Sequence, residues 1–487
     1  MYINKLSTFL KCIKYAQLSQ NRLNSTMQES CDTIQKCLGL SKSYALKLVK
    51  SNGLTRVDKE NIIENVNLLS SLGFTKEEII NNGVLLRRSC KQLQDQCLVL
   101  KEVGFKDVTP TVLVNFRKLL YKTVKTLKNM SFLSKDCNVF ANLLTHLDPK
   151  PSDFLIGYKY NEQDMVAKIH AVIIKKYLEW RLEATPTEIE TTFRKYRTLN
   201  YKSFQNISEN IKFALSIGFP PKKLLGFNYV LITNPNYPKT IIKEMPFMHD
   251  LDMKVAMRRY PKLATITPRN FKKIYEILKK EEFPDEFIKH HMNVFCLSPK
   301  TVLFRLNELK RTPELNILRG NPNILKLIVH YNRTRYRMSI MKDMDLKCFT
   351  VNPLEKDDEE LFDNKMKLGN DMNAKYDVIL LLKGLLNADK DTLKNGLKKH
   401  PHYLEIPLLE IKTTVKFLQK NFSNEAILNV LPIVLYPISK IRDALRILNL
   451  MKDLSYGNLS ETNKLNLILY IIEKSHHFTG DGVWTNK

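Results

Sequence analysis

Three arginines and two tyrosines alternate in one short stretch of this chain. Arg333, Arg335 and Arg337 are interleaved with Tyr331 and Tyr336 over seven residues. A planar guanidinium can bind two phosphate oxygens at once, and an aromatic ring beside it can stack on an exposed base. The pattern therefore favours binding of a phosphate polymer over catalysis.

The surrounding segment is strongly basic as well. Residues 254–342 hold 20 Lys and Arg against 7 Asp and Glu, a net of +13 out of +27 for the whole 487-residue chain. A protein with so large an excess attracts polyanions, although a basic helix face can also be merely solvated, with lysine stems covering apolar neighbours. The cations that we predict to contact nucleic acid are Arg258, Arg259, Lys262, Arg269, Arg305, Arg311, Arg319, Lys326, Arg333, Arg335 and Arg337.

Motifs of other chemistries are missing from the sequence. It contains no G-x-x-x-x-G-K-[ST] or G-x-G-x-x-G loop for a nucleotide, no H-E-x-x-H and no G-x-S-x-G. None of the eight cysteines forms a C-x-x-C pair, and the histidine pairs lack acids at metal-ligand spacing. We therefore predict no enzyme activity, no catalytic residue, no metal and no cofactor.

The first acidic residue is Glu29, and residues 1–28 carry Lys5, Lys11, Lys14 and Arg22 among several serines and threonines. Ile3, Leu6, Phe9, Leu10 and Ile13 fall on one helical face. A basic, hydroxylated, amphipathic start without acids is typical of a mitochondrial transit peptide. We predict import of the chain into the mitochondrial matrix; the alternative is a disordered basic tail.

A short motif recurs along the chain and predicts helical repeats. It consists of an apolar residue, Gly, Phe or Leu, and a helix-starting residue, and we call it the corner motif. Gly would end one helix in the left-handed conformation, the aromatic residue or Leu would pack at the corner, and Ser, Thr or Pro would start the next helix. The copies are 38–41, 72–75, 103–105 and 217–220, with degenerate copies at 282–284 and 421–423.

A second motif, built on proline, lies between these copies. It occurs around Pro261, Pro322, Pro401 and Pro437, where proline would interrupt a helix. Because the first corner glycines lie 34 and 31 residues apart, the period is about 32 residues. A single unit of this size cannot bury its own apolar face, so the units are expected to stack. The fold prediction is an all-α, superhelical solenoid of helical repeats.

The charge pattern sets the predicted domain boundaries. Residues 343–371 hold nine acids against four lysines, which favours a solvated linker or insertion. The predicted organisation is a transit peptide at 1–28, a repeat array at 29–342, an acidic linker or insertion at 343–375, further repeats at 376–455 and a tail at 456–487.

These features together resemble the mitochondrial transcription termination factor (mTERF) family over roughly residues 38–455. The resemblance rests on the import signal, the corner motifs, the proline motif and the period near 32; the tail around 478–484 favours an insect member. It implies a right-handed superhelix of three-helix repeats that binds double-stranded DNA or structured RNA without a cofactor. Residues 120–210, with few clean corner motifs, and the acidic stretch depart from the family pattern.

The expected function is regulation of transcription, by termination or initiation, through binding of double-stranded mitochondrial DNA. A protein bound in this way would block or position the polymerase, or recruit a second DNA-bound mitochondrial transcription factor. We expect a monomer that does not span a membrane. The alternatives are a ribosomal-RNA-binding assembly factor on the same fold, a pentatricopeptide-type reader of single-stranded RNA, and a HEAT-like scaffold for acidic proteins.

Overall fold

The computed structural model describes residues 27–55, 57–152, 156–355, 359–369, 371–450, 459–476 and 478. The chain is all-α apart from one two-stranded hairpin, β1 (Phe247–Met248) and β2 (Leu251–Asp252), within these residues. No helix in the described ranges combines the length and the apolar character that crossing a membrane needs. The predicted all-α class is therefore confirmed, and the predicted transit peptide lies, but for residues 27 and 28, outside the described residues.

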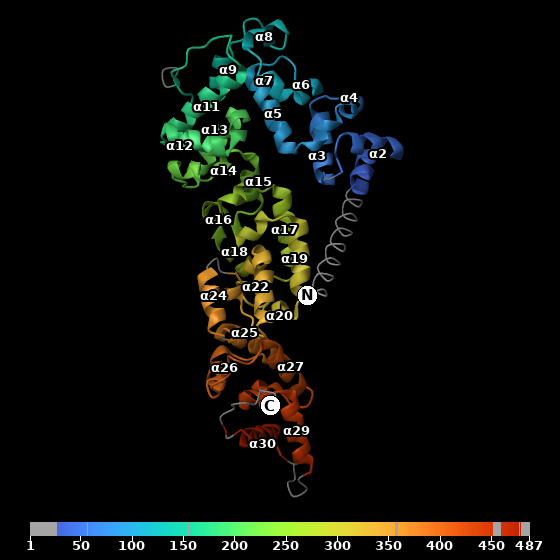
Figure 1. Ribbon diagram of the computed structural model, residues 1–487, viewed down its shortest axis with the longest axis vertical. Coiled ribbons are helices and arrows are strands. Elements are labelled where there is room, and N and C mark those ends of the chain that lie inside the picture. Colours follow the sequence, from blue (N-terminus) through green and yellow to red (C-terminus); the bar gives the residue numbers. More distant parts are fainter. Residues whose placement is uncertain are drawn as a thin grey trace, which may run out of the picture. The chain divides into compact units, whose positions relative to one another are not determined.

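The chain divides into two compact units. Unit 1 comprises residues 1–240 and 257–265, and unit 2 comprises residues 241–256 and 266–487. Residues 27–38 are helical. The elements that follow in unit 1, drawn from blue to green in Figure 1, are α2 (Lys42–Ser51), α3 (Lys59–Ser71), α4 (Lys76–Asn81), η1 (Gly83–Arg87), α5 (Cys90–Val103), α6 (Pro110–Val114), α7 (Phe116–Leu120), α8 (Val124–Asn129), α9 (Val139–Thr145), α11 (Val166–Leu182), α12 (Pro186–Lys195), η2 (Arg197–Tyr201), α13 (Phe204–Ser216), η3 (Pro221–Leu225), α14 (Asn228–Leu231) and η4 (Pro261–Thr265).

Two helices, α15 (Asn236–Glu244) and α16 (Met253–Arg259), contain two of the three points where the chain passes from one unit to the other, and the third lies between residues 265 and 266. The elements of unit 2 that follow the hairpin are α17 (Pro268–Lys280), α18 (Asp285–His290), η5 (Met292–Cys296), α19 (Pro299–Arg311), α20 (Pro313–Asn316), α21 (Ile324–Val329), α22 (Tyr331–Asp343), α23 (Val351–Glu355), α24 (Glu359–Lys367), α25 (Lys375–Leu386), α26 (Lys390–Leu397), α27 (Leu408–Leu418), α28 (Asn424–Asn429), η6 (Leu431–Leu435), α29 (Ile438–Leu450) and α30 (Glu461–Lys474).

A recurring structural unit explains both sequence motifs. A short α-helix is followed by a five-residue 3₁₀-helix and then by a long amphipathic helix, as in α4–η1–α5, α18–η5–α19 and α28–η6–α29. Pro261 opens η4, and Pro437 lies between Tyr436, the C-cap of η6, and the first residue of α29. Proline suits these places because it cannot continue an α-helix but fits a first turn. Leucine, isoleucine and phenylalanine side chains of each unit form its buried core.

The corner motif ends helices as predicted. Gly73, Gly104 and Gly218 have φ values of 88°, 99° and 84°, a region that favours glycine. The amide of each following Phe donates to the carbonyl five residues back, for example Phe105 N to Leu100 O at 3.0 Å. This bond satisfies a carbonyl that the helix end would otherwise leave unpaired. The following helix starts as predicted too, because Thr75 forms a capping box with Glu78.

The same corner also occurs without glycine, at the degenerate copy 282–284 and at two places where the sequence shows no corner motif. Ser131, Glu183 and Glu282 adopt positive φ values of 62°, 52° and 60°, and the next residue makes the same bond to the carbonyl five residues back. Residues 120–210 therefore contain two corners in which a non-glycine residue stands in the left-handed position. At these two corners the residue type departs from the family pattern, whereas the backbone conformation is the same as at the glycine corners.

Two predicted segments contain packed helices. Residues 343–375, predicted as an acidic linker or insertion, include α23 and α24, and α23 packs against α21 and α22. Their charges conceal an apolar set that is buried: Cys348, Phe349, Val351, Leu354, Phe362 and Met366. The predicted tail, 456–487, contains α30, which packs against α28 and α29 with Leu465 and Ile468 fully buried. The passage between the two units lies at 240–266 and not in the acidic stretch.

Candidate nucleic-acid interface

Three of the predicted cations are exposed at the end of unit 1. Arg258, Arg259 and Lys262 all reach solvent, and the Arg259 guanidinium lies 5.6 Å from the centre of the Tyr260 ring. A Cβ atom at Gly218 would stand 3.2 Å from Nη1 of Arg258. The corner glycine therefore lets this guanidinium lie against the backbone, with its remaining donors available to an anion.

The alternating arginines of α22 divide between two faces of the helix. Arg333 and Arg337 are four residues apart and share a face, whereas Arg335 lies on the other side. Arg337 is 3% exposed; its Nη1 donates to Pro353 O at 2.9 Å, and its guanidinium stacks 4.6 Å from the centre of the Phe362 ring. Arg333 is half-buried and donates to Glu355 O at 2.9 Å. These two arginines attach α22 to α23 and α24.

Arg305 also serves the fold. Its Nη1 donates to Ile328 O and Val329 O, at 2.7 and 3.0 Å, at the end of α21. Asn65 and Asn210 do the same on other long helices; Asn210 Nδ2 donates to Leu231 O and Thr233 O at 2.8 and 2.9 Å. A polar side chain on a long helix thus repeatedly satisfies the free carbonyls of a neighbouring short helix, which carry a high cost if left unpaired.

Two further predicted cations are engaged by buried carboxylates in unit 2. Arg319 and Lys310 both pair with Glu281, at 3.2 and 2.6 Å, and Lys326 pairs with Glu355 at 2.6 Å. The Arg319 guanidinium also lies 5.1 Å from the Phe283 ring centre. Lysine and arginine lower the pKa of the Glu281 carboxyl, against the opposite effect of its burial. Arg319 and Lys326 therefore hold neighbouring repeats together.

The remaining predicted cations of unit 2 are exposed. Arg269 reaches solvent at the start of α17, and the Arg311 side chain is 79% exposed with a long 3.4 Å pair to Glu308. Arg335 is exposed, its guanidinium 5.9 Å from the Tyr331 ring centre and its Nη1 3.4 Å from the Tyr331 hydroxyl. Arg311 and Arg335 keep most of their donors directed to solvent.

Phe304 joins Tyr331 and Tyr336 in an aromatic patch beside Arg335, and the sequence did not predict its place there. Phe304 of α19 is 45% exposed and meets Tyr331 edge to face with ring centres 6.0 Å apart, while Tyr336 is 67% exposed. Only Val302, Leu306 and Leu309 lie on the buried stripe of α19. The helical spacing of those three is the signal that leaves Phe304 on the outer face. We call Arg335, Phe304, Tyr331 and Tyr336 the α19–α22 surface.

The described residues show no cluster of three or more His, Cys, Asp or Glu side chains that could hold a metal ion. The seven described cysteines are free thiols: Cys31, Cys37, Cys90, Cys97, Cys137, Cys296 and Cys348. Burial raises the pKa of the Cys90 and Cys97 thiols to about 11, so neither is an activated nucleophile.

A comparison with curated proteins finds a relative along almost the entire chain. The chain is 26% identical over 465 residues to transcription termination factor 5, mitochondrial, of Drosophila melanogaster, an alignment that covers 93% of this chain and 83% of the relative. No family profile matches the chain, and no solved structure does.

Over nearly its whole length the chain is similar to a mitochondrial transcription termination factor. Both the family resemblance and its insect character, which the sequence predicts, are confirmed by the fly relative, as is the predicted mitochondrial localisation.

Proposed function

We propose that this protein binds double-stranded mitochondrial DNA and regulates transcription there. The observation that carries the proposal is the α19–α22 surface, where an exposed guanidinium lies beside partly exposed aromatic rings and the rings of Phe304 and Tyr331 meet. The fly relative is named as a mitochondrial transcription termination factor, which supports the same assignment. The contacting cations are then the exposed ones: Arg258, Arg259, Lys262, Arg269, Arg311 and Arg335.

The partners of the other predicted cations favour an indirect role for them. Arg305, Arg319, Lys326, Arg333 and Arg337 are engaged by carbonyls or carboxylates, so they position the helices that carry the exposed residues. Contacts from exposed arginines to phosphate set the register of a protein on DNA and carry little sequence information. We infer a monomer whose repeats stack as a right-handed superhelix and which acts passively, by obstructing or positioning the polymerase or by recruiting a second DNA-bound factor.

Salt-dependent binding tests this proposal. The full chain without its predicted import segment is titrated onto a mitochondrial DNA duplex between 50 and 200 mM salt. We expect a log–log slope corresponding to roughly 4 to 10 released ions. Replacing Arg258, Arg259, Arg311 and Arg335 by Gln together should lower that slope by about four, because each lost phosphate contact removes nearly one ion.

A matched variant controls for net charge. Lys390, Lys394, Lys398 and Lys399 lie on or just after α26, and Lys390, Lys398 and Lys399 are exposed. Replacing these four lysines by Gln removes the same charge and should leave most of the slope intact. Equal losses in both variants would mean that the cations act only through net charge. Stronger binding of structured RNA than of duplex DNA, at equal salt, would assign the same surface to ribosomal RNA instead.

A further inference from the structure

A hollow in unit 1 involves none of the residues assigned above to the interface. It has a volume of about 280 Å³ and lies between the end of α3, α5, α13 and the segment that leads into α15. Leu68, Leu72 and Leu98 form an apolar wall, and Lys91, Gln94 and Asn234 face them from the polar side. Small-molecule sites usually measure roughly 300–1,000 Å³, so this hollow suits a ligand at the small end of that range.

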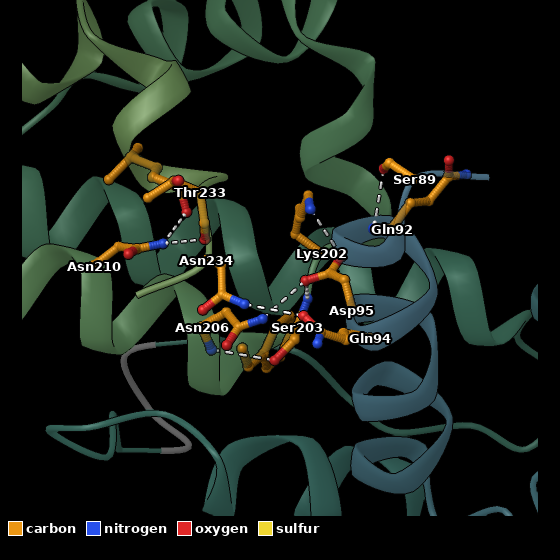
Figure 2. Close-up of polar contacts among 12 residues, drawn as sticks. Ser89, Gln92, Gln94, Asp95, Lys202, Ser203, Asn206, Asn210, Thr233 and Asn234 are labelled. Carbon is orange, nitrogen blue, oxygen red and sulfur yellow. Dashed lines mark hydrogen bonds and ion pairs between the residues drawn. The ribbon is translucent and has the colours of Figure 1, made fainter. Parts of the chain in front are cut away.

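The polar side of the hollow is built around a buried carboxylate that is already satisfied. Figure 2 shows Asp95 of α5 facing Lys202 and Asn206 at the start of α13. The carboxylate is 4% exposed, pairs with Lys202 Nζ at 3.0 Å and accepts from Asn206 Nδ2 at 3.1 Å. Asp95 therefore has its counter-ion and offers little compensation to a second cation.

Lys91 is that second cation. It stands four residues before Asp95 on α5 and thus on the same helix face, near Lys202. Its ammonium makes no hydrogen bond and no ion pair with any residue that the structure describes. Burial, and next the charge of Lys202, lower its pKa to about 8. Lys101 adds an exposed positive charge at the rim, so the hollow has an excess of positive charge without a partner.

Two amides provide hydrogen-bonding groups beside this charge. Asn234 Nδ2 donates to Gln94 Oε1 at 3.0 Å, as Figure 2 shows, and Asn234 Oδ1 accepts from Asn236 N. The Gln94 amide nitrogen and one lone pair of each oxygen remain for a ligand. A flat ring could lie along the leucine wall with its polar edge toward these amides. The ligand that fits is anionic at one end and a polar ring at the other.

We propose that this hollow binds a small phosphate ester of mononucleotide size, with Lys91 holding the phosphate and Gln94 and Asn234 facing the rest. The phosphate belongs either to a free mononucleotide or to a nucleotide of a bound nucleic acid. This site does not depend on the α19–α22 surface. Different variants disable the two sites.

Calorimetric titration of the full chain tests the site. The probes are adenosine 5′-monophosphate, inorganic phosphate and adenosine, at constant ionic strength and pH 7. We expect the monophosphate to bind at least tenfold more tightly than adenosine, since Lys91 is charged below its pKa of about 8. Lys91→Met should weaken that binding at least tenfold, whereas Lys118→Met, at an exposed lysine of α7, should leave it unchanged.

The thermal stability of the variants distinguishes a ligand-binding lysine from a structural one. Because Lys91 has no internal partner, Lys91→Met should melt at the same temperature as the parent protein or higher. A lower melting temperature together with unchanged monophosphate binding would overturn the proposal, as would equal effects of the two lysine variants.

The source of the phosphate follows from a parallel titration with duplex DNA. If no mononucleotide binds, but Lys91→Met alone lowers the salt slope by about one ion, the phosphate is that of the nucleic acid. If neither ligand responds to Lys91→Met, the proposal fails. A variant with Arg335→Gln should retain monophosphate binding. The monophosphate test of the hollow therefore remains valid even if the proposed DNA interface is wrong.

Discussion

The junction of α5 with α13 in unit 1 and the junction of α22 with α23 in unit 2 bury opposite charges. In unit 1 the interior holds the carboxylates of Asp95 and Glu102, which are 4% and 1% exposed. Glu102 accepts hydrogen bonds from Ser203 Oγ at 2.6 Å and from the amides of Phe204 and Gln205 at 2.9 and 3.0 Å. The carboxyl group thus lies at the positive end of α13, where a negative charge is favourable, but burial outweighs these hydrogen bonds and raises its pKa to about 7.

In unit 2 the buried charge is a guanidinium. Arg337 is 3% exposed and is held by a backbone carbonyl and an aromatic ring. Burying an arginine on a carbonyl removes a cation from the surface, whereas the buried Asp95 pairs with Lys202 and leaves Lys91 without an ion pair to any described residue. The count of basic residues in a segment therefore overstates the positive surface in unit 2 and understates it around Lys91 in unit 1.

The largest expected effect that tests this comparison is loss of the buried guanidinium. Arg337→Ala removes the stacking on Phe362 and leaves Pro353 O without its donor. We expect a loss of about 2–4 kcal/mol in the free energy of unfolding, from lost packing and an unpaired carbonyl. Urea unfolding followed by circular dichroism measures it. A change within about 0.5 kcal/mol, the usual range for surface sites, would show that Arg337 is not a packing residue.

The next effect compares carbonyl capping in the two units. Asn210→Ala in unit 1 leaves two buried carbonyls without their hydrogen-bond donor, and we expect the free energy of unfolding to fall by about 2–3 kcal/mol. Arg305→Ala in unit 2 removes the donor from two carbonyls at a half-buried position that water can reach. We therefore expect the free energy of unfolding to fall by only about 1–2 kcal/mol. The same unfolding measurement gives both values. The reverse order would mean that the stacking of Arg305 on Tyr331 matters more than the hydrogen bonds.

These buried arginines also show how far the sequence could lead. Helix ends, corner glycines and proline breaks are local signals, and they predicted the repeat and its all-α class. Which of two arginines on α22 would face Pro353 depends on how α23 packs, a contact between segments that no local pattern encodes. The acidic residues around 357–360 dominated the pattern there, and they concealed the apolar positions, such as Phe362, that fold the segment against its neighbours.

The Lys91 site gives a smaller, pH-dependent effect. Because the folded-state pKa of Lys91, about 8, lies below its ordinary value of 10.5, the unfolded chain binds the proton more tightly. The group therefore costs stability below about pH 8, and that cost is relieved as the pH rises toward 10.5. We expect Lys91→Met to melt a few degrees above the parent protein at pH 7, with the difference vanishing near pH 10. A difference that stays constant with pH would assign the gain to methionine packing and not to the charge.

The smallest effect on stability is expected at Arg335, the exposed member of the alternating arginines. Its guanidinium makes only a long contact with the Tyr331 hydroxyl, so Arg335→Gln should change the free energy of unfolding by less than about 0.5 kcal/mol. The same variant should lower the salt slope of duplex binding by about one ion, because it removes one phosphate contact. Comparison of Arg335→Gln with Arg337→Ala separates the DNA-binding role of one arginine of α22 from the packing role of the other. If Arg335→Gln unfolds the protein while Arg337→Ala only weakens DNA binding, α22 presents the opposite face to the nucleic acid.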